Sequence, residues 1–322
     1  MSKPSLLTRR LSVAASSSFS HQRHNSLLDS ADTIDHNFLL YQSCSIGDTA
    51  AVATILDENA NLDLNAKNGR SGSTALFAAS LRGNKAIVEL ILATSECDVN
   101  LERNDGTTPL IIAAQEGHVE VVRMLLTTEQ VDVNKANKGR SPLFMACYKQ
   151  HVDVVQLLIA QKATNMNQQE SEGGLTSLMI ACSKGYTNVV DLLLRSNAVD
   201  VNAIDHSGQT AFFKACLHGF GDIIQSLSVH RYLDGSISRR ADHSTALQVA
   251  CMMGHTSDII ATILATRGTD VNHVNDDGYT ALHYAEEAKE HDVVIMLNLL
   301  GGGGRRQSSQ EVSDMCQVCR LQ

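Results

Sequence analysis

Apolar and polar positions recur along the chain in one order that repeats at a nearly constant interval. Seven copies of a short pattern, Thr or Ser followed by small and large apolar residues, span most of the chain. They begin at Thr74, Thr108, Ser141, Thr176, Thr210, Thr245 and Thr280, at intervals of 34, 33, 35, 34, 35 and 35 residues. A period of this length is typical of a solenoid, in which each unit buries its apolar face against its neighbours. The pattern therefore favours a binding surface over an enzyme.

Each unit predicts two short helices and a turn. The opening Thr or Ser is suited to cap a helix, and Pro109 and Pro142 stand at the first helical position, where no N–H is needed. Runs such as 119–126 and 152–159 are apolar at i, i+3 and i+4, which predicts a second helix. A polar stretch then predicts a turn. A glycine nine residues after the opening residue is suited to end the first helix, at Gly83, Gly117, Gly185, Gly219 and Gly254.

These residues resemble the ankyrin repeat family. NDDGYTALHYA, at 275–285, is similar to the family's turn and T-P-L-H-x-A opening, and TPLIIAAQEGHVEVVRMLL, at 108–126, matches through both helices. A degenerate unit starts near Phe38, so the resemblance covers about residues 37–300. It implies an all-α solenoid of about eight helix-turn-helix units with β-turn fingers. We expect residues 1–36 to be a disordered, basic, Ser-rich arm and residues 301–322 to be a flexible C-terminal tail.

Composition agrees with a helical array and indicates no chemistry. The chain has 3 Pro, no Trp and 4% aromatic residues, and it lacks both long alternating strand patterns and an apolar run long enough to span a membrane. No H-E-x-x-H, G-x-S-x-G or phosphate-loop motif is present. We therefore predict no enzyme activity, no cofactor and no bound metal. Three histidines, at His118, His151 and His255, occupy equivalent repeat positions, where a structural hydrogen bond is expected.

The cysteines fall into the repeat. Five of them stand six residues after the start of a unit, where other units carry Ser80 or Ala114: Cys44, Cys147, Cys182, Cys216 and Cys251. This position needs a small buried side chain, and neighbouring helices at about 8–10 Å are too far apart for a disulfide. The sequence thus favours reduced thiols in an intracellular compartment over a redox function.

The two tails carry short motifs of low specificity. Ser12 and Ser308 each follow a pair of arginines, as in sites for basophilic kinases, so both are candidate phosphorylation sites. Residues 1–28 of the arm are basic and contain no acid, which favours a regulatory segment of a cytoplasmic protein. It leaves a nuclear location open, with mitochondrial or plastid targeting as the alternative. Cys316 and Cys319 have the C-x-x-C spacing of half a zinc site, and we expect tail thiols, with a truncated zinc module as the alternative.

A candidate partner surface follows from the implied concave face, which consists of finger tips and first-helix ends. In the N-terminal half this face carries eight basic and three acidic residues, whereas the whole chain has a net charge of −9. Such a strip selects an acidic partner, although the alternative is an ordinary solvated face. A pI near 5.8 argues against nucleic acid. The candidate binding residues are Arg70, Arg82, Arg103, Lys135, Lys138, Arg140, Tyr148 and Lys149, with apolar anchors at Leu81, Leu217, Met252, Met253 and Tyr279.

The resulting functional prediction is a protein adaptor or scaffold, monomeric on its own, that binds a protein partner with an acidic segment. The alternative is a regulatory or targeting subunit of an enzyme complex, gated by phosphorylation of the tails. One unit departs from the pattern, because Lys214 stands where an apolar residue is usual and the following helix is weakly apolar. We therefore expect residues 214–244 to be a less stable part of the array.

Overall fold

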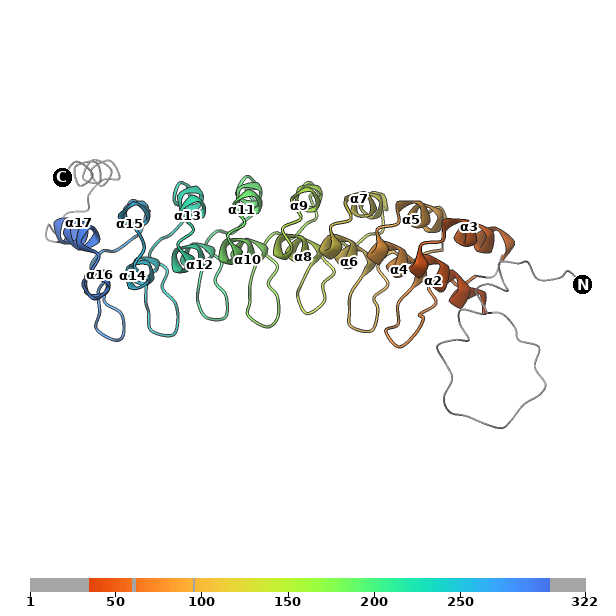
Figure 1. Ribbon diagram of the computed structural model, residues 1–322, viewed down its shortest axis with the longest axis horizontal. Coiled ribbons are helices and arrows are strands. Elements are labelled where there is room, and N and C mark those ends of the chain that lie inside the picture. Colours follow the sequence, from red (N-terminus) through yellow and green to blue (C-terminus); the bar gives the residue numbers. More distant parts are fainter. Residues whose placement is uncertain (1–34, 60–61, 95, 302–322) are drawn as a thin grey trace, which may run out of the picture. The chain divides into compact units, whose positions relative to one another are not determined.

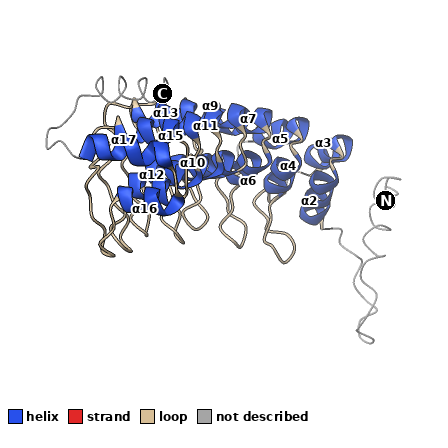
Figure 2. Cartoon of the chain, turned by 60° about the vertical axis from the view of Figure 1, so that its left-hand side comes forward, coloured by secondary structure: helices blue, strands red, loops and turns tan. Residues whose placement is uncertain are grey.

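The computed structural model describes residues 35–59, 62–94 and 96–301, and within these residues it contains 16 α-helices in consecutive pairs. Two isolated β-bridges, Asn68 with Ser73 and Asn137 with Arg140, are the only extended pairings in the same residues. Figure 2 accordingly shows helices joined by loops. The all-α fold with about eight helical pairs is confirmed. The helices belong to two compact units, which divide between Asp132 and Val133.

The first unit contains three helical pairs. In each pair the first helix packs against its second helix, and equivalent helices of successive pairs also contact each other. Figure 1 shows the loops on the side of the first helices that faces away from the second helices. The helices are α2 (His36–Ile46), α3 (Thr49–Glu58), α4 (Ala75–Arg82), α5 (Lys85–Leu92), α6 (Pro109–Glu116) and α7 (Val119–Thr127).

The second unit repeats this arrangement five times. The even-numbered helices stack in one row and the odd-numbered helices in another (Figure 1). The last helix extends through Gly301, the residue at which the sequence places the start of the tail. The helices are α8 (Pro142–Tyr148), α9 (Val152–Ile159), α10 (Ser177–Lys184), α11 (Thr187–Leu194), α12 (Ala211–His218), α13 (Gly221–Ser228), α14 (Ala246–Met252), α15 (Ser257–Leu264), α16 (Ala281–Ala288) and α17 (His291–Gly301).

The opening Thr or Ser of each unit caps its first helix, as predicted. In α4 the Thr74 hydroxyl accepts the N–H of Phe77 at 3.1 Å, and in α8 the Ser141 hydroxyl accepts the N–H of Phe144 at 3.2 Å. Glycines end most first helices in the left-handed conformation, with φ of 70° at Gly83. Two units place a residue with a side chain there, Gln150 (φ 63°) and Lys289 (φ 60°). These two units accept backbone strain that glycine avoids.

The five repeat cysteines are buried, as the sequence predicts. Each exposes 2% of its surface or less, and all are free thiols. Burial raises the pKa of the Cys44 and Cys251 thiols to about 12. The last repeat differs, because Glu286 occupies the equivalent position and is exposed. Because this position is exposed, a charged side chain stays solvated there.

Asparagine side chains join the base of each finger to the next. Asn167 is typical: its Nδ2 donates to the carbonyl of Ala198 at 2.8 Å, and its Oδ1 accepts the N–H of Asp200 at 2.8 Å. The same pair of hydrogen bonds is made by Asn65, Asn100, Asn134 and Asn202. We call this series the asparagine ladder. Ser236 takes the asparagine position in the next finger, so the ladder ends there.

Histidines make the corresponding link between helices. The ring of His118 hydrogen-bonds the carbonyl of Leu81 at 3.0 Å, and the ring of His255 hydrogen-bonds the carbonyl of Cys216 at 2.9 Å. The predicted structural role is therefore confirmed for these two residues. Asn84 makes the same contact to Gly47 at 3.3 Å. These bonds give carbonyls at the ends of first helices a hydrogen-bond partner from the next repeat.

Candidate partner-binding surface

The eight predicted binding residues are divided between the two units. Arg70, Arg82 and Arg103 belong to the first unit and the other five to the second. Arg70 and Arg82 are exposed, as are Lys138, Tyr148 and Lys149 in the second unit, whereas Arg103, Lys135 and Arg140 are half-buried. Each unit therefore carries its own part of the predicted set, and the use of these residues by a partner stays a prediction.

Part of the predicted positive charge is neutralised within the chain. The guanidinium of Arg103 contacts the carboxylate of Asp105 at 2.6 Å and lies 5.2 Å from the ring centre of Phe77. In the second unit Glu172 lies 3.7 Å from the ammonium of Lys138 and 3.0 Å from the guanidinium of Arg140. Because the strip of eight basic and three acidic residues did not include Glu172, it carries less net charge than the sequence suggests.

Tyr148 lies at the centre of a different basic group. Its ring has the ammonium of Lys149 at 5.9 Å and that of Lys184 at 4.6 Å from its centre, and 40% of Tyr148 is exposed. Within the described residues no carboxylate oxygen lies within 4 Å of either ammonium. Sequence reasoning selected Tyr148 and Lys149 but missed Lys184. The period contained the signal, since Lys184 stands 35 residues after Lys149 at the same place in the repeat.

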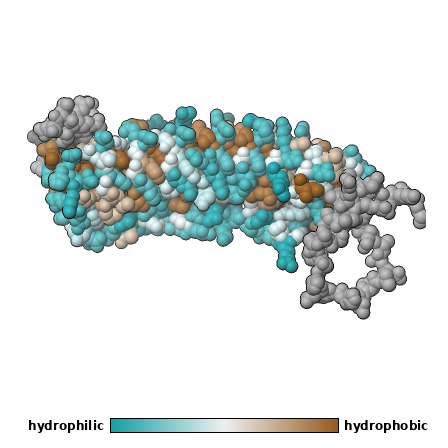
Figure 3. Space-filling view, in the orientation of Figure 1, coloured by the Kyte–Doolittle hydropathy of each residue, from teal (hydrophilic) through white to brown (hydrophobic). Residues whose placement is uncertain are grey.

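Large apolar side chains are exposed at one position of the repeat. Leu81, Tyr148 and Met252 all stand seven residues after the start of a unit and expose 39%, 40% and 43% of their surfaces. Met253 follows with 50% exposed, and Tyr279, before the last unit opens, exposes 43%. Leu217 is half-buried. On the face drawn in Figure 3 hydrophilic residues predominate, and hydrophobic ones gather in small separate patches.

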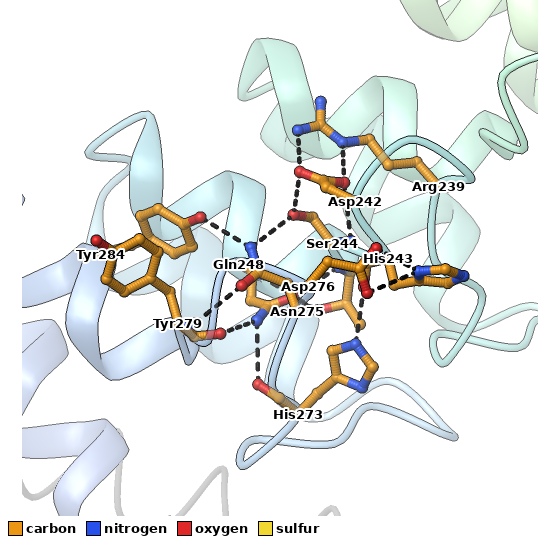
Figure 4. Close-up of polar contacts among 11 residues, drawn as sticks. Arg239, Asp242, His243, Ser244, Gln248, His273, Asn275, Asp276, Tyr279 and Tyr284 are labelled. Carbon is orange, nitrogen blue, oxygen red and sulfur yellow. Dashed lines mark hydrogen bonds and ion pairs between the residues drawn. The ribbon is translucent and has the colours of Figure 1, made fainter.

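A polar network joins the last two fingers of the second unit (Figure 4). The Gln248 Nε2 donates to the carbonyls of His273 (3.0 Å) and Tyr279 (2.7 Å). The Asn275 Nδ2 donates to the Ser244 hydroxyl at 3.2 Å and to the Tyr284 hydroxyl at 3.0 Å. Sequence reasoning identified none of these contacts, because they join residues that lie 9 to 31 positions apart in the chain. The network accounts for the polar residues of these fingers as structural links.

The network contains a serine, a histidine and an aspartate, the residue types of a hydrolase triad, but they are not arranged as in a triad. The His243 Nδ1 lies 2.9 Å from the Asp276 carboxylate, whereas the Ser244 hydroxyl donates to Asp242 at 2.7 Å. Arg239 pairs with the same Asp242 carboxylate and holds the pKa of that acid well below its usual range. A serine nucleophile needs its hydroxyl on an imidazole nitrogen, which this arrangement does not provide.

The unusual Lys214 has a partner that the sequence analysis missed. Its ammonium lies 2.6 Å from the carboxylate of Asp205 and 3.0 Å from the Oε1 of Gln209, and both charged side chains are almost fully buried. A buried charge is tolerated when it is paired and hydrogen-bonded. The structure therefore supplies a reason why this unit accepts a lysine, and the predicted lower stability of 214–244 stays a prediction.

The described residues offer neither a metal site nor a membrane-spanning helix. No group of three or more His, Cys, Asp or Glu side chains in residues 35–59, 62–94 and 96–301 is arranged to hold a metal ion. No helix of those ranges is long and apolar enough to cross a lipid bilayer. The candidate sites Ser12, Ser308, Cys316 and Cys319 lie outside the described residues, so they stay predictions.

Comparison with known proteins identifies the class of protein. A family model described as "Ankyrin repeats (3 copies)" matches residues 76–170, 162–238 and 222–301, which shows that the chain belongs to the ankyrin repeat family. Ankyrin repeat domains are generally protein-binding modules and typically non-catalytic. No curated protein matches the sequence.

A solved structure supports the same fold. The ankyrin repeat domain of Bcl-3, a member of the IκB protein family, superposes with a TM-score of 0.61 at 23% sequence identity. The match covers 73% of this chain and 99% of that domain. At this level of identity the likeness establishes the fold alone.

Proposed function

We propose that the chain is a non-enzymatic adaptor or scaffold that binds a protein partner on the face formed by finger tips and first-helix ends. The observation that carries the proposal is the repeated exposure of a large apolar side chain at one position, in Leu81, Tyr148 and Met252. Large apolar or aromatic side chains at the centre of an interface often supply most of its binding energy. In the second unit Tyr148 and Met252 share this position in one row of stacked helices, which supports a contact along that row.

The basic residues favour an acidic partner. Arg70 and Arg82 in the first unit and Lys149 in the second are exposed, and no carboxylate of the described residues forms an ion pair with them. Charges of this kind raise the association rate of an oppositely charged partner and help to select it. Because Lys138 and Arg140 already pair with Glu172, we expect them to contribute less than the sequence suggests.

The proposal is tested by affinity purification of the full chain with mass spectrometry, alongside a variant in which the apolar anchors are polar. The variant carries Leu81→Gln, Tyr148→Gln and Met252→Gln; all three sites are at least 39% exposed, so we expect the fold to persist by circular dichroism. A partner that is retained by the wild type and lost by the variant supports the adaptor. If the wild type and the variant retain the same partners, the exposed apolar side chains do not form the binding surface.

The same experiment separates the alternative from the adaptor. A regulatory or targeting subunit should co-purify in fixed stoichiometry with one enzyme, and its addition should change that enzyme's rate. An adaptor should instead join two partners without altering either activity. Phosphomimetic Ser12→Asp and Ser308→Asp variants then test whether the tails regulate binding.

A further inference from the structure

In the second unit the C-terminal ends of the first helices form a row with three kinds of chemistry. The row consists of the residues seven and eight positions after each opening residue, on α8, α10, α12, α14 and α16. These helices stack in order, each against the next. Equivalent positions on successive helices therefore follow one another at the helix spacing, which is about 8–10 Å.

The row begins with uncompensated positive charge. Lys149 and Lys184 approach the ring of Tyr148 from α8 and α10, and the ammonium of Lys184 lies 4.6 Å from the ring centre. Both lysines are exposed. By contrast, Lys138 and Lys214 of the same unit contact the carboxylates of Glu172 and Asp205. The first end of the row can therefore accept a carboxylate beside an aromatic ring.

The middle of the row is apolar. Leu217 on α12 is half-buried, and Met252 and Met253 at the end of α14 expose 43% and 50% of their surfaces. Methionine side chains are flexible and polarisable, which suits them to contact apolar groups of varied shape. His218, the other row residue of α12, has its ring centre 5.7 Å from that of Phe220. An aliphatic or aromatic side chain fits here better than a charged one.

The row ends in negative charge. On α16 the row contains Glu287, which is exposed and directly follows Glu286. Within the described residues no basic side chain lies within ion-pair distance of the Glu287 carboxylate. Lys289 and Glu290 follow at the helix end, so residues 286–290 sum to −2 (three Glu, one Lys). The sign of charge therefore reverses from α10 to α16, with the apolar stretch between the two ends.

From this order we infer that the row binds an extended peptide segment of a partner. The peptide carries an acidic residue that contacts the lysines, then an apolar residue that contacts the methionines, and then a basic residue that contacts α16. The inference rests on the proposed function and specifies its ligand. The distance along the row from Lys184 on α10 to Met252 on α14 is two helix spacings, about 16–20 Å. An extended chain rises about 3.3–3.6 Å per residue, which separates the acidic and apolar residues by about five or six positions. One further helix spacing leads from α14 to α16, so the basic residue of the peptide should lie about three positions beyond its apolar residue.

The experiment selects peptides on the full 322-residue chain. A displayed library of random peptides of about 12 residues is long enough to reach all three parts of the row. The recovered consensus is synthesised, and its Kd is measured by fluorescence polarisation with the wild type and three variants. One variant carries Lys149→Glu and Lys184→Glu, the second carries Met252→Gln and Met253→Gln, and the control carries Lys162→Glu, an exposed lysine of the same unit outside the row.

The expected consensus has an acidic residue about five or six positions from an aliphatic or aromatic one. The Kd should rise at least about tenfold in each row variant and stay unchanged in the control. Exchange of the acidic residue of the peptide for Lys should restore binding to the doubly reversed variant. Selected peptides that lack this spacing, or that bind both row variants as tightly as the wild type, overturn the inference.

Failure of this inference can be told apart from failure of the adaptor proposal. If no peptide is enriched while the full chain still retains a partner in affinity purification, the extended-peptide row is wrong and the adaptor function stands. If neither a peptide nor a protein partner is retained, both are wrong. Matching melting temperatures of the variants exclude loss of fold as the cause.

Discussion

Helices α8, α10 and α12 of the second unit differ from α14 in the side chain that they bury at one repeat position. Three residues after the start of a unit, α8, α10 and α12 carry Phe144, Met179 and Phe213, which expose 4% or less. The same position in α14 is Gln248, which is equally buried at 1%. Its amide bonds the carbonyls of His273 and Tyr279 in the next finger (Figure 4).

The difference shows that one repeat period accommodates two ways of joining neighbours. A buried apolar side chain needs only a cavity of the right volume, so Phe and Met can replace each other there. A buried amide needs a partner for each polar group, because an unsatisfied one costs about 1–3 kcal/mol. The apolar junctions are therefore tolerant and the polar junction is specific.

The largest expected effect comes from the one ion pair buried inside the apolar stretch. Asp205→Ala leaves the ammonium of Lys214 buried with only Gln209, so we expect a loss of about 3 kcal/mol in the free energy of unfolding. Lys214→Met should cost much less, because Asp205 still accepts the N–H groups of Ser207 and Gln209. Urea denaturation measures both, and equal losses would contradict this assignment.

A reciprocal exchange tests the comparison directly. Gln248→Met removes the donor to the His273 carbonyl, and Met179→Gln buries an amide among apolar side chains. Each change should lower the free energy of unfolding by about 2 kcal/mol. Thermal melts of the two single variants provide the measurement. If both exchanges are neutral, the two kinds of junction are interchangeable and the comparison fails.

The pH dependence of stability reports whether both kinds of junction shield their thiols equally. Burial raises the pKa of Cys251 on α14 to about 12 from an ordinary 9.0. The unfolded thiol therefore ionises first as pH rises, so the stability from this group is present below pH 9 and is lost toward pH 12. Cys251→Ala should remove about 1 kcal/mol of the loss between about pH 9 and 10.

Cys182→Ala is the matched variant on the apolar side, since burial also raises the pKa of Cys182. Stability curves at several pH values should show the same change for both variants. A smaller change for Cys251 would mean that the polar junction opens locally before the array unfolds.

The smallest expected effect concerns the ends of the first helices. Gln150 adopts φ 63° where Gly185 of the next unit adopts 75°. Gln150→Gly should stabilise the chain by about 0.5 kcal/mol, because it removes left-handed strain from a residue with a Cβ. The reverse change, Gly185→Ala, should destabilise, since the added Cβ would lie 2.9 Å from the Phe220 ring. Melting temperatures that move in the opposite directions would refute this account.

Local features were predictable from the sequence. The helix caps at Thr74 and Ser141 and the buried Cys182 depend on spacing within one unit or on the comparison of units, so the period reveals them. The resemblance supplied the fold class for the same reason. Features that recur in every repeat can therefore be predicted from the sequence.

Contacts that break the period were not predictable. Glu172 neutralises Lys138 and Arg140, and Asp205 neutralises Lys214, because fingers bring these side chains together through rotamers that spacing alone does not specify. The positive charge of the candidate surface was therefore overestimated, and the use of that surface by a partner stays a prediction. Lys184 shows that the missing members of a site can still be found by following one position through every unit.

The asparagine ladder also bears on how such a chain can grow. Each rung is complete within two adjacent fingers: Asn134 contacts residues 163 and 165, and Asn167 contacts 198 and 200. An internal duplication of one repeat would arrive with its own rung and would leave every older rung intact. Ser236 marks a place where this copying rule is interrupted. A gene segment inserted after it would have to evolve a new link, so lengthening of the array is easier among the earlier repeats.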